Sequence, residues 1–425
     1  MNFIKVHLDS LGPGLVFALG CFGARDFISN TIAGATFGMG MVWVPILAIL
    51  IRFVLLDASA RYVMATGDTV LSGIGSFGRT PVLILFLISL LRRHVSALTK
   101  VLLLGIAADM VLPLPIPTPY SVVLWAILSW SISFVVLFWG RYQSAEWISR
   151  PVAAIMAISL LLVIVISQPD LKYLGASLFS WSDRTQSNHD QASLIALAVF
   201  TAAVGSISNL SYSAYIHEKG WLSLKSLRAQ KFDLILSLIL MALMIVMIQF
   251  AAASILSSRR ISVEKIEDIA RVYSEILGSP GRILFGVTLW CGAFASSISN
   301  GAGQGMMLAD AYHRFLFRRE NSDLLDTLPS HMPAYRWSIL FMFTSPLYVF
   351  LTDWTPMGLV FAYSLISLAT LPVMIAMLLV LTSSRKRMGG QVNSVLANLV
   401  LVFTIFFSIF IAWQGYLELT QSTGT

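Results

Sequence analysis

Apolar residues fill this chain in long runs that short polar stretches separate. Each of eleven runs is long enough to cross a bilayer as a helix. They lie near residues 11–37, 40–66, 80–113, 119–140, 147–167, 191–217, 228–257, 282–314, 333–353, 357–383 and 394–417. The pattern predicts an all-α integral membrane protein of about eleven transmembrane helices. No other region has the composition of a separate domain, so residues 1–425 are expected to form a single membrane domain.

Two stretches between the runs are polar enough to lie in water. Residues 168–190 are rich in Ser, Asp, Gln and Asn and predict a loop. Residues 262–277 carry apolar side chains at helical spacing, after Ser262 and before Gly278-Ser279-Pro280. They predict a short amphipathic helix over the external mouth of the protein.

Composition and charge agree with a membrane protein. Of the 425 residues, 57% are hydrophobic and 12% are charged. The net charge of +7 does not indicate a nucleic-acid partner, because the lysines and arginines gather in alternate loops. By the positive-inside rule, this distribution places the N-terminus in the cytoplasm. We therefore expect a multi-pass protein of a cell membrane, a bacterial inner membrane, whose partner is the lipid bilayer; the oligomeric state stays open.

The first run contains an arginine and a carboxylate in its middle. Arg25 and Asp26 lie there beside Gly20 and Gly23. A charged residue at the centre of a membrane helix costs about 2.5–3.5 kcal/mol on insertion scales, and such residues generally line a functional site. Glycines loosen a helix. The stretch predicts a broken helix that lines a polar site, with a self-neutralising Arg–Asp pair as the alternative.

The sixth run contains a second polar interruption, in which Gly205 precedes Ser206, Ser208, Asn209 and Ser211. The first and sixth runs each begin a block of five helices. Interrupted helices at matching places in two blocks indicate an inverted-repeat transporter with a site at mid-membrane. The blocks would be residues 11–167 and 191–383, with 394–417 as an extra helix. A polar seam between packed helices is the alternative for the sixth run.

Short motifs that run in order through the first ten runs resemble the natural resistance-associated macrophage protein (NRAMP) family of divalent metal transporters. They are Gly12-Pro13-Gly14, Ala33-Gly34-Ala35-Thr36-Phe37-Gly38, Ala60-Arg61, Ala65-Thr66-Gly67, Tyr215-Ile216-His217, Ser296-Ser297, Ala302-Gly303-Gln304, Met307 and Leu371-Pro372. The resemblance implies the fold of the bacterial leucine transporter: two inverted five-helix repeats with helices 1 and 6 broken. It also implies secondary-active transport by alternating access.

The departures from the family fall on its functional motifs. Where the family carries Asp-Pro-Gly-Asn in the first span, this chain has Gly23-Ala24-Arg25-Asp26. The family's metal-binding Asp is therefore absent, and a carboxylate stands at the Asn position. The family's Met-Pro-His in the sixth span is Leu210-Ser211-Tyr212 here, without a thioether. Acidic residues of the third span are replaced by basic ones.

Two hypotheses for the cargo follow. In the first, Asp26 and Asn209 hold a divalent metal of the Mg²⁺ or Mn²⁺ class, helped by neutral oxygens. The full substrate-binding set would be Gly23, Arg25, Asp26, Ile207, Ser208, Asn209, Ser211 and Gln304. In the second, metal transport is lost and Arg25 binds the carboxylate of a small organic anion or zwitterion. We expect no resident cofactor.

Further charged residues lie within the spans and are candidates for a proton or ion path. They are Arg92, Arg93, His94 and Lys100 in the third run and His217 at the end of the sixth. A histidine titrates near neutral pH, which would suit proton-linked symport. As the alternative, the cations of the third run pair with Asp57, Asp109 or Asp310. No arrangement of nucleophile and base is present in the sequence, so we expect a transporter and not an enzyme.

Overall fold

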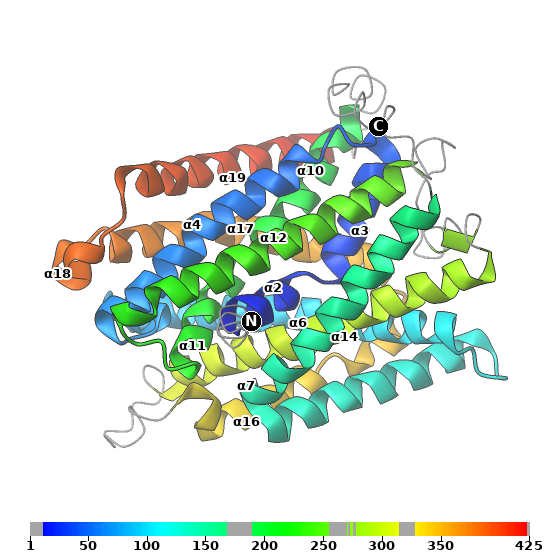
Figure 1. The fold of residues 1–425 in the computed structure, drawn as a ribbon, viewed down its shortest axis with the longest axis horizontal. Coiled ribbons are helices and arrows are strands. Elements are labelled where there is room, and N and C mark those ends of the chain that lie inside the picture. Colours follow the sequence, from blue (N-terminus) through cyan, green and yellow to red (C-terminus); the bar gives the residue numbers. More distant parts are fainter. Residues whose placement is uncertain are drawn as a thin grey trace, which may run out of the picture.

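The computed structural model describes residues 12–167, 189–254, 278–313 and 328–422, with Ala270, Tyr273 and Ser274 between them. Within these residues the fold is entirely helical (Figure 1). The first half contains α2 (Pro13–Cys21), α3 (Ala24–Phe37), α4 (Trp43–Thr66), α5 (Val70–Gly75), α6 (Arg79–Val111) and α7 (Thr118–Ser167). The second half contains α10 (His189–Val204), η1 (Ile207–Leu210), α11 (Ser211–Glu218), η2 (Leu224–Ser226), α12 (Leu227–Ala252), α14 (Ser279–Ala311), η5 (Pro329–His331), α16 (Pro333–Thr344), η6 (Leu347–Leu351), α17 (Pro356–Thr382), α18 (Arg385–Met388), η7 (Gly389–Gln391) and α19 (Val395–Ser422).

Eight helices of the described part are long and apolar enough to cross a membrane. The sequence predicts eleven spans, and the difference has physical causes. The first run is divided into α2 and α3, each shorter than a bilayer requires. The fourth and fifth runs form one element, α7, which changes direction at Arg141. In the ninth run, α16 ends at Thr344 because Pro346 disfavours helix continuation. The count of eleven remains a prediction.

The two predicted water-exposed stretches lie mostly outside the described residues. Of the expected loop at 168–190, residues 189–190 begin α10. Of the expected amphipathic helix at 262–277, the structure describes Ala270, Tyr273 and Ser274, which are helical.

The short helix α2 lies at the centre of the bundle, and α19 runs along one edge (Figure 1). Every residue of α2 is buried. Helices α7, α12 and α14 pack against it. In contrast, α19 exposes Phe403, Phe406, Phe410 and Trp413, as expected for a helix that faces lipid. The broken helix therefore occupies the position where a solute site would be enclosed from all sides.

The N-terminus of α2 is capped by a carboxylate from a distant helix. Asp233 of α12 accepts hydrogen bonds from the amide of Gly12 at 3.2 Å and from that of Gly14 at 2.6 Å. The first amides of a helix lack partners within the helix, and the helix dipole favours negative charge there. Pro13 lacks an amide hydrogen and fits the first turn. Asp233 therefore fixes where the central helix starts.

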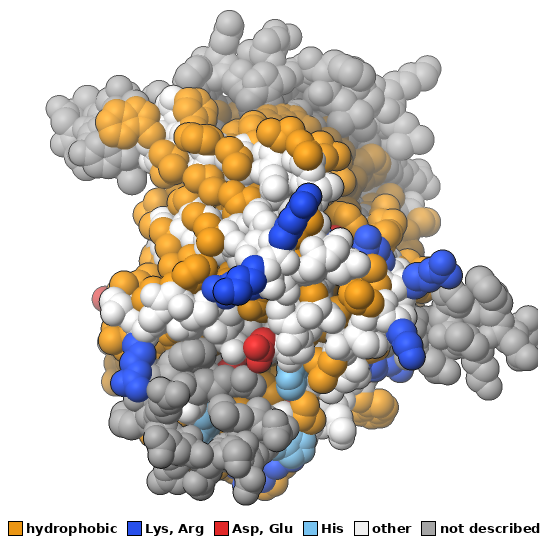
Figure 2. Space-filling model, turned by 90° about the vertical axis from the view of Figure 1, so that its left-hand side faces the viewer, with side chains coloured by type: hydrophobic (Ala, Val, Ile, Leu, Met, Phe, Trp, Pro, Cys, Tyr) orange, Lys and Arg blue, Asp and Glu red, His pale blue; other side chains and the backbone are white. Residues whose placement is uncertain are grey.

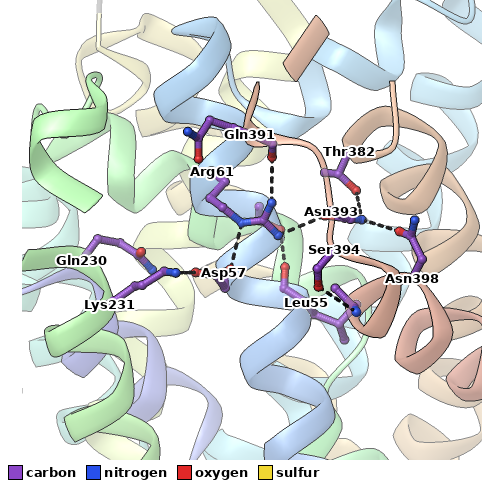
Figure 3. A network of polar contacts seen from close by, with 12 residues as sticks. Leu55, Asp57, Arg61, Gln230, Lys231, Thr382, Gln391, Asn393, Ser394 and Asn398 are labelled. Carbon is purple, nitrogen blue, oxygen red and sulfur yellow. Dashed lines mark hydrogen bonds and ion pairs between the residues drawn. The ribbon is translucent and has the colours of Figure 1, made fainter. Parts of the chain in front are cut away.

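A polar network joins α4 to α12 and to the segment that follows α17, at the end of the bundle that carries α18. Arg61 of α4 donates to Asp57 at 2.8 Å, to the Gln391 carbonyl at 2.7 Å and to Asn393 at 3.0 Å (Figure 3). Lys231 of α12 lies 3.8 Å from Asp57. Lysine and arginine side chains stand out across this end (Figure 2). The network ties α4 to the segment between α17 and α19.

Candidate functional site

The first helix is interrupted after Cys21. Phe22 and Gly23 are extended, with ψ of 107° and −161°, and α3 begins at Ala24. A Cβ at Gly23 would lie 2.8 Å from Ser296 Oγ of α14, so only glycine permits this close approach. Ser296 Oγ donates to the Gly20 carbonyl at 3.0 Å. The break is therefore held against α14, as the sequence predicts for a glycine-flanked interruption.

Asp26 lies in the first turn of α3 and is fully buried. Its Oδ2 accepts a hydrogen bond from the Gly23 amide at 3.2 Å. Its Oδ1 has no hydrogen-bond partner among the described residues. A carboxylate at a helix N-terminus is favoured by the helix dipole. One oxygen of Asp26 is thus available to a cation or to a proton.

The sixth helix is interrupted at Gly205 and Ser206. Gly205 has φ of +75°, a conformation that favours glycine. After the break, Ile207, Ser208 and Asn209 form the short helix η1, and all three are buried. Asn209 Nδ2 donates back to the Val204 carbonyl at 3.0 Å, and Ser211 Oγ donates to the Ser208 carbonyl at 2.6 Å. The polar side chains here bind main-chain carbonyls that the break leaves without helical partners.

Arg52 of α4 occupies the break in the sixth helix. Its Nη1 donates to the Ala203 carbonyl at 2.8 Å, and its Nη2 donates to Asn209 Oδ1 at 3.2 Å. The guanidinium also lies 5.0 Å from the ring centroid of Phe17 in α2. A cation suits the negative end of α10. In this structure the amide oxygen that the sequence proposes as a metal ligand therefore already binds an arginine.

Arg25 lies beside a small cavity next to the break in the first helix. The cavity has a volume of about 20 Å³ and is lined by Gly20, Cys21, Gly23, Arg25, Ser96, Thr99, Lys100, Ser296, Asn300 and Tyr363. The Arg25 guanidinium lies 4.0 Å from the ring centroid of Tyr363 in α17, within the range of a cation–π contact. Lys100 Nζ donates to the Ser296 carbonyl at 2.9 Å. Four helical segments thus bring polar side chains to one point.

The other cations of α6 lie buried near this cavity, and two of the three carboxylates that the sequence offers as their partners, Asp57 and Asp109, bind other residues. Arg92 donates to the Tyr363 hydroxyl. No nitrogen of the Arg93 guanidinium has a hydrogen-bond partner within the described part of the chain. The proposed partners are engaged elsewhere, Asp57 with Arg61, Asp109 with Ser121 and Asp310 with Thr69. The alternative of pairing with Asp57 or Asp109 is therefore wrong.

The remaining candidates take different positions. Gln304 of α14 is fully buried, and neither atom of its amide group has a partner among the described residues. His94 is half-buried and contacts Ser345 at 3.1 Å and Tyr348 at 2.9 Å, away from the residues that line the cavity. His217 lies in the last turn of α11. The structure thus places Gly23, Arg25 and Lys100 around one cavity, whereas Ile207, Ser208, Asn209, Ser211 and Gln304 do not line it.

The described residues contain no group of three His, Cys, Asp or Glu side chains that could hold a metal ion. Cys21 and Cys291 are free, buried thiols. Sequence reasoning did not assign a role to Arg52, Asn300 or Tyr363. Arg52 could have been found, because it is a lone arginine within an apolar run. Asn300 and Tyr363 carry no comparable signal.

Solved transporter structures have the same fold. A manganese transporter of Eremococcus coleocola, in complex with an aromatic bis-isothiourea compound, matches with a TM-score of 0.74 at 16% identity, over 99% of this chain and 92% of that one. MhsT in complex with L-phenylalanine matches with a TM-score of 0.62 at 13% identity, over 96% and 98% of the chains. A nucleobase-cation-symport-1 family transporter in a closed conformation matches with a TM-score of 0.56 at 14% identity, over 96% and 90%. These likenesses confirm the predicted fold class.

Sequence comparisons identify the family. An uncharacterized protein of Pasteurella multocida is 24% identical over 158 residues, which span 37% of this chain and 36% of the relative. The chain thus matches about a third of that relative's length. The family model described as natural resistance-associated macrophage protein-like matches residues 14–418. The chain therefore belongs to the NRAMP family, and it is a multi-pass, secondary-active membrane transporter with the leucine-transporter type of fold and not an enzyme.

Proposed function

We propose that this transporter carries a divalent metal cation of the Mg²⁺ or Mn²⁺ class by alternating access, between the breaks in the first and sixth helices. The observation that carries the proposal is Asp26, a fully buried carboxylate at the break with one oxygen that has no partner in the described structure. A hard cation takes carboxylate and carbonyl oxygens as ligands. Family membership and the likeness to a manganese transporter support the metal as cargo.

Arg52 gives this proposal a specific requirement. Asn209 Oδ1 accepts a hydrogen bond from the guanidinium, so a metal bound there would lie next to a positive charge unless Arg52 withdraws. Movement of one five-helix block against the other would provide that withdrawal. We further propose that the metal is coupled to protons, and that the end of the bundle with α18 faces the cytoplasm of a bacterial inner membrane. The arginines and lysine of α18 support this orientation.

Metal uptake into proteoliposomes tests the proposal. Purified protein would be assayed with Mg²⁺ and Mn²⁺, with and without a pH gradient. We expect saturable uptake that Asp26→Asn abolishes, because the change keeps the shape of the side chain and removes its charge. Asp353→Asn, at an exposed position before α17, is the matched control and should retain full uptake. Full activity of Asp26→Asn would exclude this metal site.

A second candidate cargo is a small organic anion or zwitterion. The observation that favours it is the excess of positive charge near the break. The partly buried Arg25 and the buried Arg52, Arg92, Arg93 and Lys100 outnumber the one buried carboxylate of Asp26. An arginine binds a carboxylate through two hydrogen bonds. Such a cargo requires the cavity beside Arg25 to widen as the two blocks move.

Arg25→Met separates the two cargoes. For a metal, uptake should be unchanged or faster, because a positive charge near the dication is removed. For an organic anion, uptake should be lost. A screen of radiolabelled small carboxylates in the same proteoliposomes would then follow. Uptake of a carboxylate by wild-type protein that does not take up Mn²⁺ would favour the second candidate.

A further inference from the structure

The cavity beside the first break is lined by two cationic side chains, those of Arg25 and Lys100, and by no acidic side chain. Its polar side chains come from α3, α6, α14 and α17 and are Arg25, Ser96, Thr99, Lys100, Ser296, Asn300 and Tyr363. Arg25 and Lys100 can only donate hydrogen bonds, and the amide of Asn300 can turn its NH₂ group toward the cavity. Metal ligands would be oxygens with spare lone pairs near a carboxylate. The charge of the lining side chains therefore favours an anion and opposes a cation.

The charges around the cavity lack a matching number of carboxylates. Lys100 is buried, and so are Arg92 and Arg93 of the same helix, while Arg25 is partly buried. One nitrogen of the Arg25 guanidinium, Nη1, is buried without a partner among the described residues. Buried cations that repel each other are expensive unless negative charge lies among them. Asp26 supplies one negative charge, so Arg25, Arg92, Arg93, Lys100 and Asp26 together keep a net positive charge.

The side chains at the cavity are held in place before any ligand arrives. Lys100 Nζ is fixed by the Ser296 carbonyl at 2.9 Å, which uses one of its three hydrogens. The Arg25 guanidinium is stacked on Tyr363, and Arg92 donates to the hydroxyl of the same tyrosine. That hydroxyl keeps its own hydrogen for another acceptor. Fixed donors around a common point bind an anion without reorganisation.

The size of the cavity limits the anion. A volume of about 20 Å³ accommodates one water-sized species, since a single water needs roughly 10–15 Å³ by the same measure. A carboxylate or phosphate group has several heavy atoms and does not fit. A single-atom anion comes nearest to this size, and the space is lined by lysine, guanidinium and hydroxyl groups.

We propose that this cavity is a binding site for one small inorganic anion of the halide class, held by Lys100, Arg25 and the surrounding hydroxyl and amide groups. The anion offsets the buried positive charge next to the break in the first helix. The inference goes beyond the transported cargo, because it concerns a resident anion and not the substrate. It is compatible with a metal cargo, whereas an organic anion that binds Arg25 would have to displace the halide.

Chloride binding to the full-length protein tests the inference. Purified protein in lipid nanodiscs would be equilibrated with radioactive chloride, with gluconate as the replacement anion at constant ionic strength. We expect saturable binding of about one chloride per chain, displaced by bromide and not by acetate, which is too large. Lys100→Met removes a charged donor and should weaken binding by roughly tenfold or more. Lys386→Met, on the exposed helix α18, is the control and should bind normally.

A second variant keeps the test decisive if Lys100→Met fails to fold. Asn300→Asp has nearly the same shape and places a carboxylate against the cavity, so it should abolish chloride binding in protein that elutes as a single species on size exclusion. Absence of saturable binding in the wild-type protein would overturn the inference. Equal competition by acetate, or unchanged binding in both variants, would overturn it too. None of these outcomes depends on transport, so they are separate from the test of the cargo.

Discussion

Arg52 shows how a single side chain can determine the properties of a transport site. Its guanidinium binds the Ala203 carbonyl and Asn209 Oδ1 and therefore completes the end of α10. It also brings a permanent positive charge to the place where a metal would bind under our proposal. The same side chain thus stabilises the break and opposes a cation.

Replacing Arg52 by methionine should therefore strengthen metal binding. The change frees Asn209 Oδ1 and removes a repulsive charge, which at about 4–6 Å is worth several kcal/mol at an effective dielectric constant near 20. We expect tighter Mn²⁺ binding by calorimetry in the Arg52→Met variant, along with lower thermal stability. Arg385→Met on the exposed α18 is the control. Weaker binding in Arg52→Met would mean that Arg52 assists the metal.

Gly205 is a second position where one residue decides the geometry. At φ +75° a side chain is strained by about 1–2 kcal/mol, and a Cβ would also lie 2.7 Å from Arg52 Nη2. Gly205→Ala should lower the melting temperature more than Gly220→Ala, because Gly220 has φ +74° with open space around it. Thermal unfolding followed by intrinsic tryptophan fluorescence measures both. Equal decreases in melting temperature would show that only the backbone strain at positive φ matters, and not the contact with Arg52.

Single site residues could be predicted from the sequence where a charge interrupts an apolar run. Arg25 and Asp26 stand out for that reason, and the structure indeed places them beside the break. Tyr363 does not stand out, because an aromatic residue in an apolar run has no distinguishing feature. Its contacts with Arg25 and Arg92 join α17 to α3 and α6, far apart in the chain. Such long-range contacts cannot be inferred from local pattern.

At the scale of elements, glycines and polar residues in apolar runs predict the existence of both breaks. Their positions are less predictable: the sequence indicates the stretch from Gly20 to Asp26, whereas the helix is interrupted at Phe22 and Gly23. The exact position depends on packing, since Gly23 approaches Ser296 of α14. Local sequence does not contain that neighbour.

The start of α2 provides a prediction at this scale. Asp233→Asn would replace one acceptor oxygen by a donor that faces the amides of Gly12 and Gly14. A buried amide without an acceptor costs about 1–3 kcal/mol. We expect a lower melting temperature and faster proteolysis near the N-terminus, measured by limited trypsin digestion. Asp353→Asn is the control, and an unchanged digestion pattern would show that the cap is dispensable.

At the scale of the whole molecule, the Arg61 network links segments that would move apart under the alternating access that we propose. Arg61 belongs to α4, and Asn393 lies between α17 and α19 (Figure 3). Weakening these bonds should favour the state that is open at the end with α18. The expected change is in the fraction of molecules that are open at this end.

The rate at which Cys21 reacts with an added reagent would measure this fraction. It lines the small cavity and is buried in this structure. In a Cys291→Ser background, Asn393→Ala should speed the reaction of Cys21 with a membrane-impermeant maleimide added from the α18 side. Reaction from the opposite side should slow down. Labelling rates measured by mass spectrometry test this, and equal acceleration from both sides would indicate general loosening of the fold.

The junction at Arg141 has a mechanical consequence. The fourth and fifth runs meet inside one 50-residue element, α7, where Arg141 is the non-helical residue with φ of 53°. A connection of one residue has almost no slack, whereas a flexible loop would absorb displacement. Any tilt of the fifth run, whose Ser149 hydroxyl lies 3.1 Å from that of Ser299 in α14, is therefore transmitted directly to the fourth. We therefore expect the two runs to move together, with any change of angle between them confined to Arg141.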